Sequence, residues 1–205
     1  VGYRGAPSQN VVSQQVQPIR IVETIPANTW KKINDSTYIF DFARNMSGVT
    51  RIKVSGEEGT VVKLKHGERL YDNGRVNTSN IDVYHRPVDD SDPFQTDILI
   101  LSGKGEDEFM ARFNYKGFRY VEVTSSKPIE LQQNSLTAYF VHSDVPQKGE
   151  ISTSNPLVNR LWWATNNAYL SNLMGYPTDC PQREKNGWTG DGHFAIETAS
   201  VSYTH

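Results

Sequence analysis

The chain changes its hydrophobic pattern once, near Ser143, and this change constrains the fold more than any other feature. Before that point the apolar residues form short β-type runs separated by turn residues, which is typical of a sandwich or barrel. After it, apolar residues recur at helical spacing. We therefore predict a mainly β fold, an antiparallel β-sandwich, followed by an α-helical segment. The runs that define the expected strands are residues 19–25, 38–42, 49–54, 61–65, 98–101, 118–123 and 136–141.

Two connections within the β region carry predictions of their own. Residues 56–59, Gly-Glu-Glu-Gly, lie between the runs 51–54 and 60–64, and the paired glycines favour a tight hairpin because glycine accepts positive φ. Between residues 70 and 95 the chain is polar and rich in turn residues. A loop of this length can be functional, but a surface excursion is the commoner case.

The helical segment opens with residues 154–156, Ser-Asn-Pro, a capping signal followed by proline in the first turn. We expect one helix over about 156–173 and a second that begins after Asp191. Two helices joined by a long connector cannot bury their apolar faces alone. Either the sandwich covers these faces or the natural chain continues, and we expect the second alternative, a fragment of a longer protein.

These patterns divide the chain into three parts. Residues 1–17 contain glycine, proline and glutamine without periodicity, and we expect a linker or an edge segment there. Residues 18–147 are expected to form a β-sandwich domain, and residues 148–205 the first part of an incomplete helical domain.

Charge and composition exclude several classes of function. The chain has 21 Lys and Arg residues against 23 Asp and Glu, a net charge of -2, and no cluster of basic residues, so nucleic-acid binding has no support. The longest apolar runs are much shorter than the roughly 20 residues of a membrane-spanning helix, so no membrane partner is expected. The single cysteine, Cys180, excludes an internal disulfide and gives no zinc-like set of ligands, so no metal is expected. It leaves the compartment open, with a periplasmic or secreted location favoured over the cytoplasm.

The segment between the two expected helices, residues 176–191, has the composition of a site that acts on sugars. It holds the carboxylates of Asp179, Glu184 and Asp191 beside Arg183 and Trp188. Carboxylates bind adjacent sugar hydroxyls, a tryptophan face packs on the apolar side of a pyranose, and a protected carboxylic acid can protonate a glycosidic oxygen. The residues alone also fit a simple interhelical loop in which Asp191 caps the second helix, Arg183 pairs with a neighbour and Trp188 fills the core.

Residues 179–191, DCPQREKNGWTGD, closely resemble the signature loop of bacterial α-L-rhamnosidases of glycoside hydrolase family 78. The resemblance covers nearly the whole chain. It includes FDFARNMSG at 40–48, FNYKGFRYV at 113–121 and VHSD at 141–144, similar to that family's sandwich, and SNPL at 154–157, similar to its first barrel helix. In such enzymes a sandwich precedes an (α/α)6 barrel, so residues 148–205 would be the incomplete N-terminal part of the catalytic barrel.

The resemblance implies hydrolysis of terminal α-L-rhamnosides with inversion. Glu184 matches the family's general acid, and Asp179 and Asp191 match carboxylates that hold the rhamnose hydroxyls. Arg183 and Trp188 match residues that line the same subsite. No cofactor is implied, and the expected partner is a rhamnose-containing glycoside or oligosaccharide.

The loop has the shorter of the two lengths that this family uses. Lys185 stands where the longer form can have a carboxylate, which leaves Glu184 as the expected acid and Asp179 as the fallback. An inverting enzyme also needs a second carboxylate that activates water, roughly 6.5–9.5 Å from the acid. No glutamate of this chain matches that base, and Glu197 is expected to be an ordinary exposed residue of the second helix. We therefore expect the base in the downstream barrel and an inactive isolated chain.

Two polar groups outside the loop have simpler explanations than a binding site. His66 and Glu68 alternate on one expected strand, and we interpret them as a satisfied strand pair because no third ligand is near. Asp89, Asp90 and Asp92 lack the spacing of a calcium loop and are expected to form a solvated acidic loop.

Aromatic residues and the cysteine also favour structural roles. Phe113, Tyr115, Phe118 and Tyr120 could form a sugar platform, but aromatic strand residues usually fill a sandwich core, which is the role we predict. Cys180 has no histidine partner in its loop and is expected to be a buried structural thiol.

Two functions of different classes follow from the sequence. The first is an α-L-rhamnosidase of which this chain is a part. The alternative is a non-catalytic carbohydrate-binding or accessory β-sandwich module.

Overall fold

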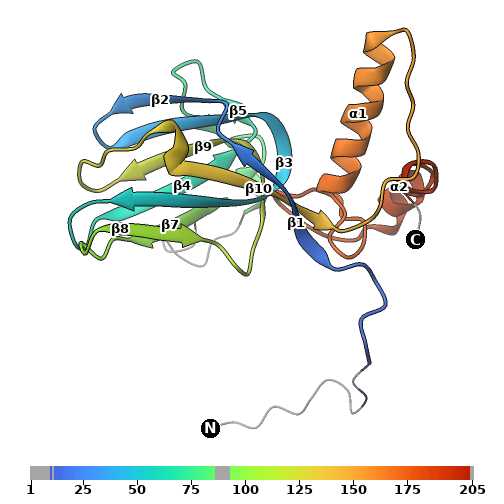
Figure 1. Cartoon of the computed structure of the whole chain (residues 1–205), viewed down its shortest axis with the longest axis horizontal. Helices are drawn as coiled ribbons and strands as arrows, with labels where there is room; N and C mark the ends of the chain where they lie inside the picture. The colour runs from blue at the N-terminus through green and yellow to red at the C-terminus, as the bar shows by residue number, and fades with distance from the viewer. Residues whose placement is uncertain (1–9, 11, 86–92, 204–205) are drawn as a thin grey trace.

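The computed structural model describes residues 10, 12–85 and 93–203, and Figure 1 shows a β-structure with two helices at one end. The strands are β1 (Ile19–Pro26), β2 (Thr29–Asn34), β3 (Thr37–Ser55), β4 (Val61–Gly67), β5 (Arg69–Leu70), β6 (Val76–Asn77), β7 (Thr96–Ile100), β8 (Glu106–Met110), β9 (Lys116–Ser125) and β10 (Leu136–Ser143). The helices are the 3-10 turns η1 (Asp82–Tyr84) and η2 (Gln133–Ser135), then α1 (Pro156–Ser171) and α2 (Thr189–Ser202).

The main sheet has eight strands and is antiparallel throughout. Its order is β1-β10-β3-β9-β4-β7, with β2 and β8 both pairing with β3, while β5 and β6 form a separate two-stranded sheet. The sheet curls over itself and encloses the core (Figure 1). The prediction of an antiparallel β-sandwich followed by helices is confirmed, with one curled sheet supplying both layers.

Strand β3 joins the two layers. Its first half pairs with β2 and β9, and its second half pairs with β10 and β8. The two strands predicted at 38–42 and 49–54 are therefore one strand, and that prediction was wrong. The register with β9 shifts between Asp41 and Met46, where Ala43 has a φ of 60° and donates its N–H to the Asp41 carboxylate at 2.7 Å. This bulge bends the strand without ending it.

The hairpin predicted at residues 56–59 is also wrong. Strands β3 and β4 follow one another in the chain but do not pair, because β4 lies between β9 and β7. Gly59 does have a positive φ, 76°. Its N–H donates to the Leu101 carbonyl at 3.0 Å, so the turn extends the β4–β7 pairing.

Within the polar region from 70 to 95, Arg75 joins the chain to the main sheet. Arg75 lies between β5 and β6 and donates two hydrogen bonds, of 2.7 and 2.6 Å, to the Glu122 carboxylate on β9. Asp89, Asp90 and Asp92, for which we predicted a solvated loop, lie outside the described residues.

Large apolar side chains from both layers fill the core. They include Tyr38, Phe40, Met46, Ile52, Leu64, Phe118, Val121, Val123, Leu131 and Leu136. His66 is also fully buried, and both of its ring nitrogens have partners. Its Nδ1 lies 3.1 Å from the Gln95 carbonyl, which can only accept, so Nδ1 donates and Nε2 accepts from the Thr50 hydroxyl at 2.9 Å. His66 is thus a satisfied structural residue, as predicted. Glu68 lies beyond the end of β4 and accepts a hydrogen bond from the Asn45 amide at 2.7 Å, so the two residues do not form the strand pair that we predicted.

Helix α1 begins as predicted. The Asn155 side chain accepts the Leu157 N–H at 2.9 Å, and proline occupies the first turn. Helix α2 begins earlier than predicted, at Thr189, with Trp188 in the N-cap position. Asp191 therefore lies within the first turn, and the interpretation in which it caps the helix is wrong.

The helices meet the sandwich at the β3 bulge and near the end of β10. Asn167 of α1 donates to the Asn45 carbonyl at 2.9 Å, and the Lys148 N–H donates to the Ser202 carbonyl at 2.8 Å. The sandwich does not cover the apolar faces of the helices, because Leu157, Leu161, Phe194 and Ile196 remain exposed. No helix in the described part of the chain is long and apolar enough to cross a membrane.

The buried histidine predicts an acid-sensitive fold. Burial, and then the nearby Lys116 charge, lowers the pKa of His66 from 6.5 to about 4, so the unfolded chain binds a proton below pH 6.5 that the folded chain excludes. The free energy of unfolding should fall between pH 6.5 and 4, by up to about 3 kcal/mol, and be unaffected by this group above pH 6.5.

Urea unfolding at several pH values tests this expectation. A His66→Gln variant should lose this part of the pH dependence, whereas His193→Gln, at an exposed histidine of α2, should keep it. Parallel pH profiles for the wild type and His66→Gln would contradict the prediction.

Candidate active site

The residues selected from the sequence lie on and beside the interhelical loop, residues 172–188, which joins α1 to α2 (Figure 1). The loop leaves α1 through Gly175, whose φ of 82° suits glycine. The Thr178 N–H then donates to the Asn172 carbonyl at 2.7 Å, which returns the chain to the end of α1. This closed turn fixes the start of the segment that carries Asp179.

Asp179 is held by hydrogen bonds within the loop. Its Oδ1 accepts the Asn186 N–H at 2.9 Å, and its Oδ2 accepts the Cys180 thiol at 3.1 Å. Burial raises the pKa of Asp179, but the hydrogen bonds from Cys180 and Asn186 together outweigh burial and hold that pKa below its usual value. Asp179 is therefore ionised at neutral pH.

Glu184 forms a small cluster with two other predicted residues. Its Oε2 accepts the Trp188 Nε1–H at 2.9 Å, and the Arg183 guanidinium lies 3.9 Å from Oε1. The Glu184 side chain is 34% exposed and Trp188 as a whole residue is 53% exposed, so both can be reached from solvent. Trp188 does not fill the core, which makes the simple-loop interpretation wrong for this residue.

The remaining two predicted residues share a pocket. Asp179 and Asp191 both line a pocket of about 250 Å³ between α1 and α2, together with Tyr169 and Thr178. Glu184 is not among the residues that line this pocket. The structure thus brings the predicted residues together as two groups on one loop, the Glu184 cluster and the Asp179–Asp191 pair.

Two contacts that sequence reasoning missed hold the loop on the sandwich. The Gln182 amide donates to the Glu68 carboxylate at 3.1 Å, just beyond the end of β4. The Lys185 ammonium donates to the Tyr115 carbonyl at 2.6 Å and lies 4.3 Å from the centroid of the Tyr115 ring. Tyr115 belongs to the segment 113–121 that resembles the same family, which was a sequence signal for that contact. Glu68 lies in none of the resembling segments, so the contact with Gln182 had no such signal.

Gly117 of β9 lies directly under the loop. A Cβ at this position would lie 2.8 Å from Pro181 Cγ and 3.2 Å from the Gln182 backbone nitrogen, so only glycine permits this approach. The Gln95 side chain fixes Gly117 from the other side, because its Nε2 donates to the Gly117 carbonyl at 2.7 Å and its Oε1 accepts the Gly117 N–H at 3.1 Å.

Ionisation in this contact region reflects its burial. Burial, and then the nearby Lys116 ammonium, lowers the pKa of Lys185 to about 8. Burial likewise raises the pKa of Tyr115 to about 12. Both shifts follow from the partial burial of these two side chains where the loop meets the sandwich.

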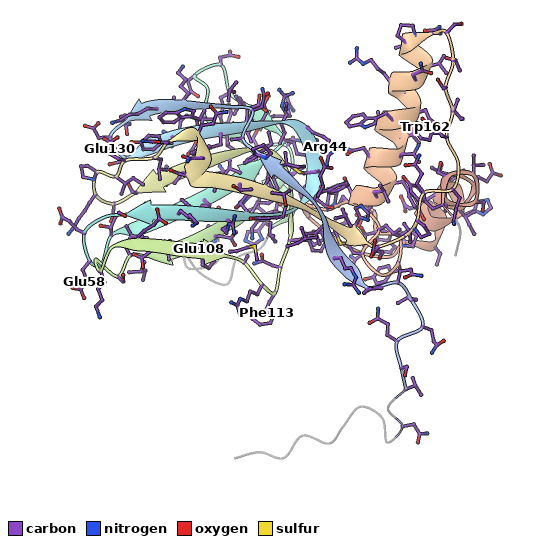
Figure 2. All side chains as sticks on the ribbon, in the orientation of Figure 1. Arg44, Glu58, Glu108, Phe113, Glu130 and Trp162 are labelled. Atoms are coloured by element: carbon purple, nitrogen blue, oxygen red, sulfur yellow. The ribbon has the colours of Figure 1, made fainter. Side chains whose placement is uncertain are left out.

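The predicted aromatic core is only partly correct. Phe118 is fully buried in the core, as expected. Phe113 is completely exposed and projects from the edge of the sandwich, because it precedes β9 in the chain (Figure 2). Tyr115 packs against the interhelical loop instead of the core. Cys180 is buried, as predicted for a structural thiol.

No metal-binding cluster of His, Cys, Asp or Glu occurs among the residues that the structure describes. The chemistry that this arrangement offers is that of carboxylic acids and their hydrogen-bond donors. A partly exposed carboxyl group with a fixed orientation beside an exposed indole, with an ionised carboxylate elsewhere on the same loop, is suited to proton transfer on a polyhydroxylated substrate.

Two family models match the chain. Residues 31–142 match the bacterial alpha-L-rhamnosidase concanavalin-like domain, and residues 146–205 match the bacterial alpha-L-rhamnosidase 6 hairpin glycosidase domain. Among curated proteins, the α-L-rhamnosidase of Streptomyces avermitilis is 34% identical over 195 residues, which is 95% of this chain and 18% of that protein. The α-L-rhamnosidase of Alteromonas sp. is 32% identical over 87% of this chain and 19% of that protein.

Solved structures agree with these matches. An α-L-rhamnosidase structure from Dictyoglumus thermophilum superposes with a TM-score of 0.83 at 35% identity, over 93% of this chain and 21% of that one. The Streptomyces avermitilis enzyme complexed with L-rhamnose gives a TM-score of 0.82 at 33% identity, over 98% of this chain and 19% of that one. The chain thus spans about a fifth of the length of the relatives that it matches.

The single cysteine provides a test of loop docking. Because Cys180 of the interhelical loop is buried and donates to Asp179, its thiol should react with Ellman's reagent much more slowly in the folded chain than in urea, by about 100-fold or more. Equal rates in the folded and unfolded chain would contradict the buried placement.

Proposed function

The chain belongs to the bacterial α-L-rhamnosidase family, and on that premise we propose that it forms the sandwich and first two helices of an enzyme that hydrolyses terminal α-L-rhamnosides with inversion. The observation that carries this proposal is the Glu184 carboxyl group, which is hydrogen-bonded to Trp188 and lies near Arg183 on the loop that also bears Asp179. Residues 18–147 would be the sandwich domain, and residues 148–205 the N-terminal part of an (α/α)6 barrel. The full-length enzyme so proposed is called the parent protein below.

The geometry around Glu184 supports a role as general acid. The Trp188 hydrogen bond fixes the orientation of the carboxyl group through Oε2. Arg183 lies 3.9 Å from Oε1, which is too far for a hydrogen bond, so Arg183 does not occupy Oε1, the oxygen that would face a glycosidic oxygen. Such proton transfer, concerted with departure of the leaving group, is what the acid of an inverting glycosidase supplies.

Asp179 is better suited to substrate binding than to acid catalysis. Its lowered pKa keeps it ionised at neutral pH, when it has no proton to give and can accept hydrogen bonds from sugar hydroxyls. Asp191 lines the same pocket and would bind hydroxyls from the α2 side. The exposed Trp188 indole offers an apolar face to the pyranose ring.

The placement of these residues favours an enzyme over a sandwich module that only binds sugar. All of them lie at 179–191, outside the sandwich strands. The water-activating base would come from the remainder of the barrel, since Glu197 is exposed on α2 and has no place in the Glu184 cluster.

Removal of the general acid should lower kcat by an amount that depends on the leaving group of the substrate. In the parent protein, Glu184→Gln should lower kcat on a rhamnoside with a poor leaving group, such as an alkyl glycoside, by about 10²–10⁴. The loss on an activated aryl rhamnoside should be smaller, because a stable phenolate leaves without a proton. Glu197→Gln is the matched control and should retain normal kcat on both. Unchanged turnover of the alkyl rhamnoside by Glu184→Gln would refute Glu184 as the acid.

The Asp179–Asp191 pocket leads to a prediction about sugar binding that is independent of the acid. Asp191→Asn in the parent protein should raise the Kd for L-rhamnose by about 10-fold or more, because a charged hydrogen-bond acceptor is lost. Calorimetric titration measures this change, with Asp144→Asn, at an exposed aspartate that pairs with Arg20, as control. If Asp191→Asn and the control bind L-rhamnose equally well, Asp191 does not contact the sugar.

A further inference from the structure

Glu184 and Lys185 are neighbours in the chain, but their side chains contact different parts of the protein. Lys185 has a φ of 56°, in the left-handed region that a lysine rarely adopts. The Glu184 carboxylate binds Trp188, whereas the Lys185 side chain reaches the sandwich. This backbone conformation costs free energy, and it persists only where contacts with the surrounding structure compensate for that cost.

The Lys185 side chain makes two contacts with a single sandwich residue. Its ammonium donates to the Tyr115 carbonyl at 2.6 Å and also lies over the ring of Tyr115, 4.3 Å from the centroid. These contacts act directly on the residue after Glu184, so any movement of Lys185 moves the Glu184 backbone.

A second point of contact lies on the other side of Glu184. Pro181 packs on Gly117, and Gln95 fixes Gly117 through both of its backbone polar groups. We call Gln95, Tyr115 and Gly117 the platform. Contacts with the platform at Pro181 and at Lys185 therefore bracket Glu184 in the chain.

We propose that Lys185 is a positioning residue that fixes the Glu184 carboxyl group by joining the interhelical loop to the platform. This inference rests on the proposed function and extends it, because it makes the sandwich a part of the catalytic geometry. A general acid must lie within hydrogen-bonding reach of its oxygen, and displacement by about 1 Å can cost 10²-fold in rate. The burial that lowers the pKa of Lys185 to about 8 agrees with a side chain that the platform holds away from water.

The test uses the parent protein and compares two rhamnosides, an alkyl glycoside and an activated aryl glycoside. Lys185→Met, which removes both contacts with Tyr115, should lower kcat on the alkyl glycoside by about 10- to 100-fold. KM should change much less than kcat, and the aryl glycoside should lose less activity than the alkyl glycoside. A residue needed only for stability would lower both activities equally.

Two further variants separate positioning from folding. Lys185→Arg keeps a cation and a donor for Tyr115 and should restore most of the lost kcat. Gly117→Ala leaves Lys185 intact but places a methyl group against Pro181, and it should reproduce the leaving-group dependence of Lys185→Met. Lys127→Met is the matched control, because Lys127 forms an exposed pair with Glu57 and should leave kcat unchanged.

The outcomes distinguish this inference from the proposed function. If Glu184→Gln lowers alkyl-rhamnoside turnover while Lys185→Met and Gly117→Ala retain it within about 2-fold, the positioning role is wrong and the acid assignment stands. If Lys185→Met does not fold, Gly117→Ala decides the question, and an equal loss on both substrates by Gly117→Ala overturns the proposal. If Glu184→Gln itself retains turnover of the alkyl glycoside, the proposed function is wrong and the positioning role fails with it.

Discussion

The candidate site depends on one close contact, the packing of Pro181 against the bare backbone of Gly117. This approach is possible because glycine has no Cβ and because Gln95 holds both the N–H and the carbonyl of Gly117 in place. The loop that bears Glu184 is thereby aligned on a strand of the sandwich and not only on the helices that flank it. The sandwich is thus a structural component of the site, although none of the proposed substrate-binding residues belongs to it.

Much of the fold was predictable because it follows from local patterns. Apolar runs gave the positions of β1, β4, β7, β9 and β10, and the Asn155 cap gave the start of α1. Strands β2 and β8 were missed because their sequences, TWKKIN and EDEFM, are rich in charge, and only pairing with β3 makes them strands. The continuity of β3 was missed because a bulge at a left-handed alanine has no sequence signature.

The candidate site likewise has a part that could be predicted from neighbouring residues and a part that depends on residues far apart in the sequence. The carboxylates, Arg183 and Trp188 lie within one short segment, so their proximity could be inferred from the chain alone, and the Glu184–Trp188 hydrogen bond joins two of them. The contacts from Lys185 to Tyr115 and from Gln182 to Glu68 join residues far apart in sequence. These contacts depend on how the sandwich folds, and the sequence of the loop alone contains no information about that fold.

A crystal structure of the parent protein with L-rhamnose bound measures the proposed geometry most directly. We expect the Glu184 carboxyl group within about 2.6–3.2 Å of the anomeric oxygen, the hydrogen-bonding distance that proton transfer requires. Asp179 and Asp191 should contact ring hydroxyls, with Lys185 still bound to Tyr115. L-rhamnose bound in the barrel with Glu184 out of reach of the anomeric oxygen would contradict the assignment of Glu184 as the acid.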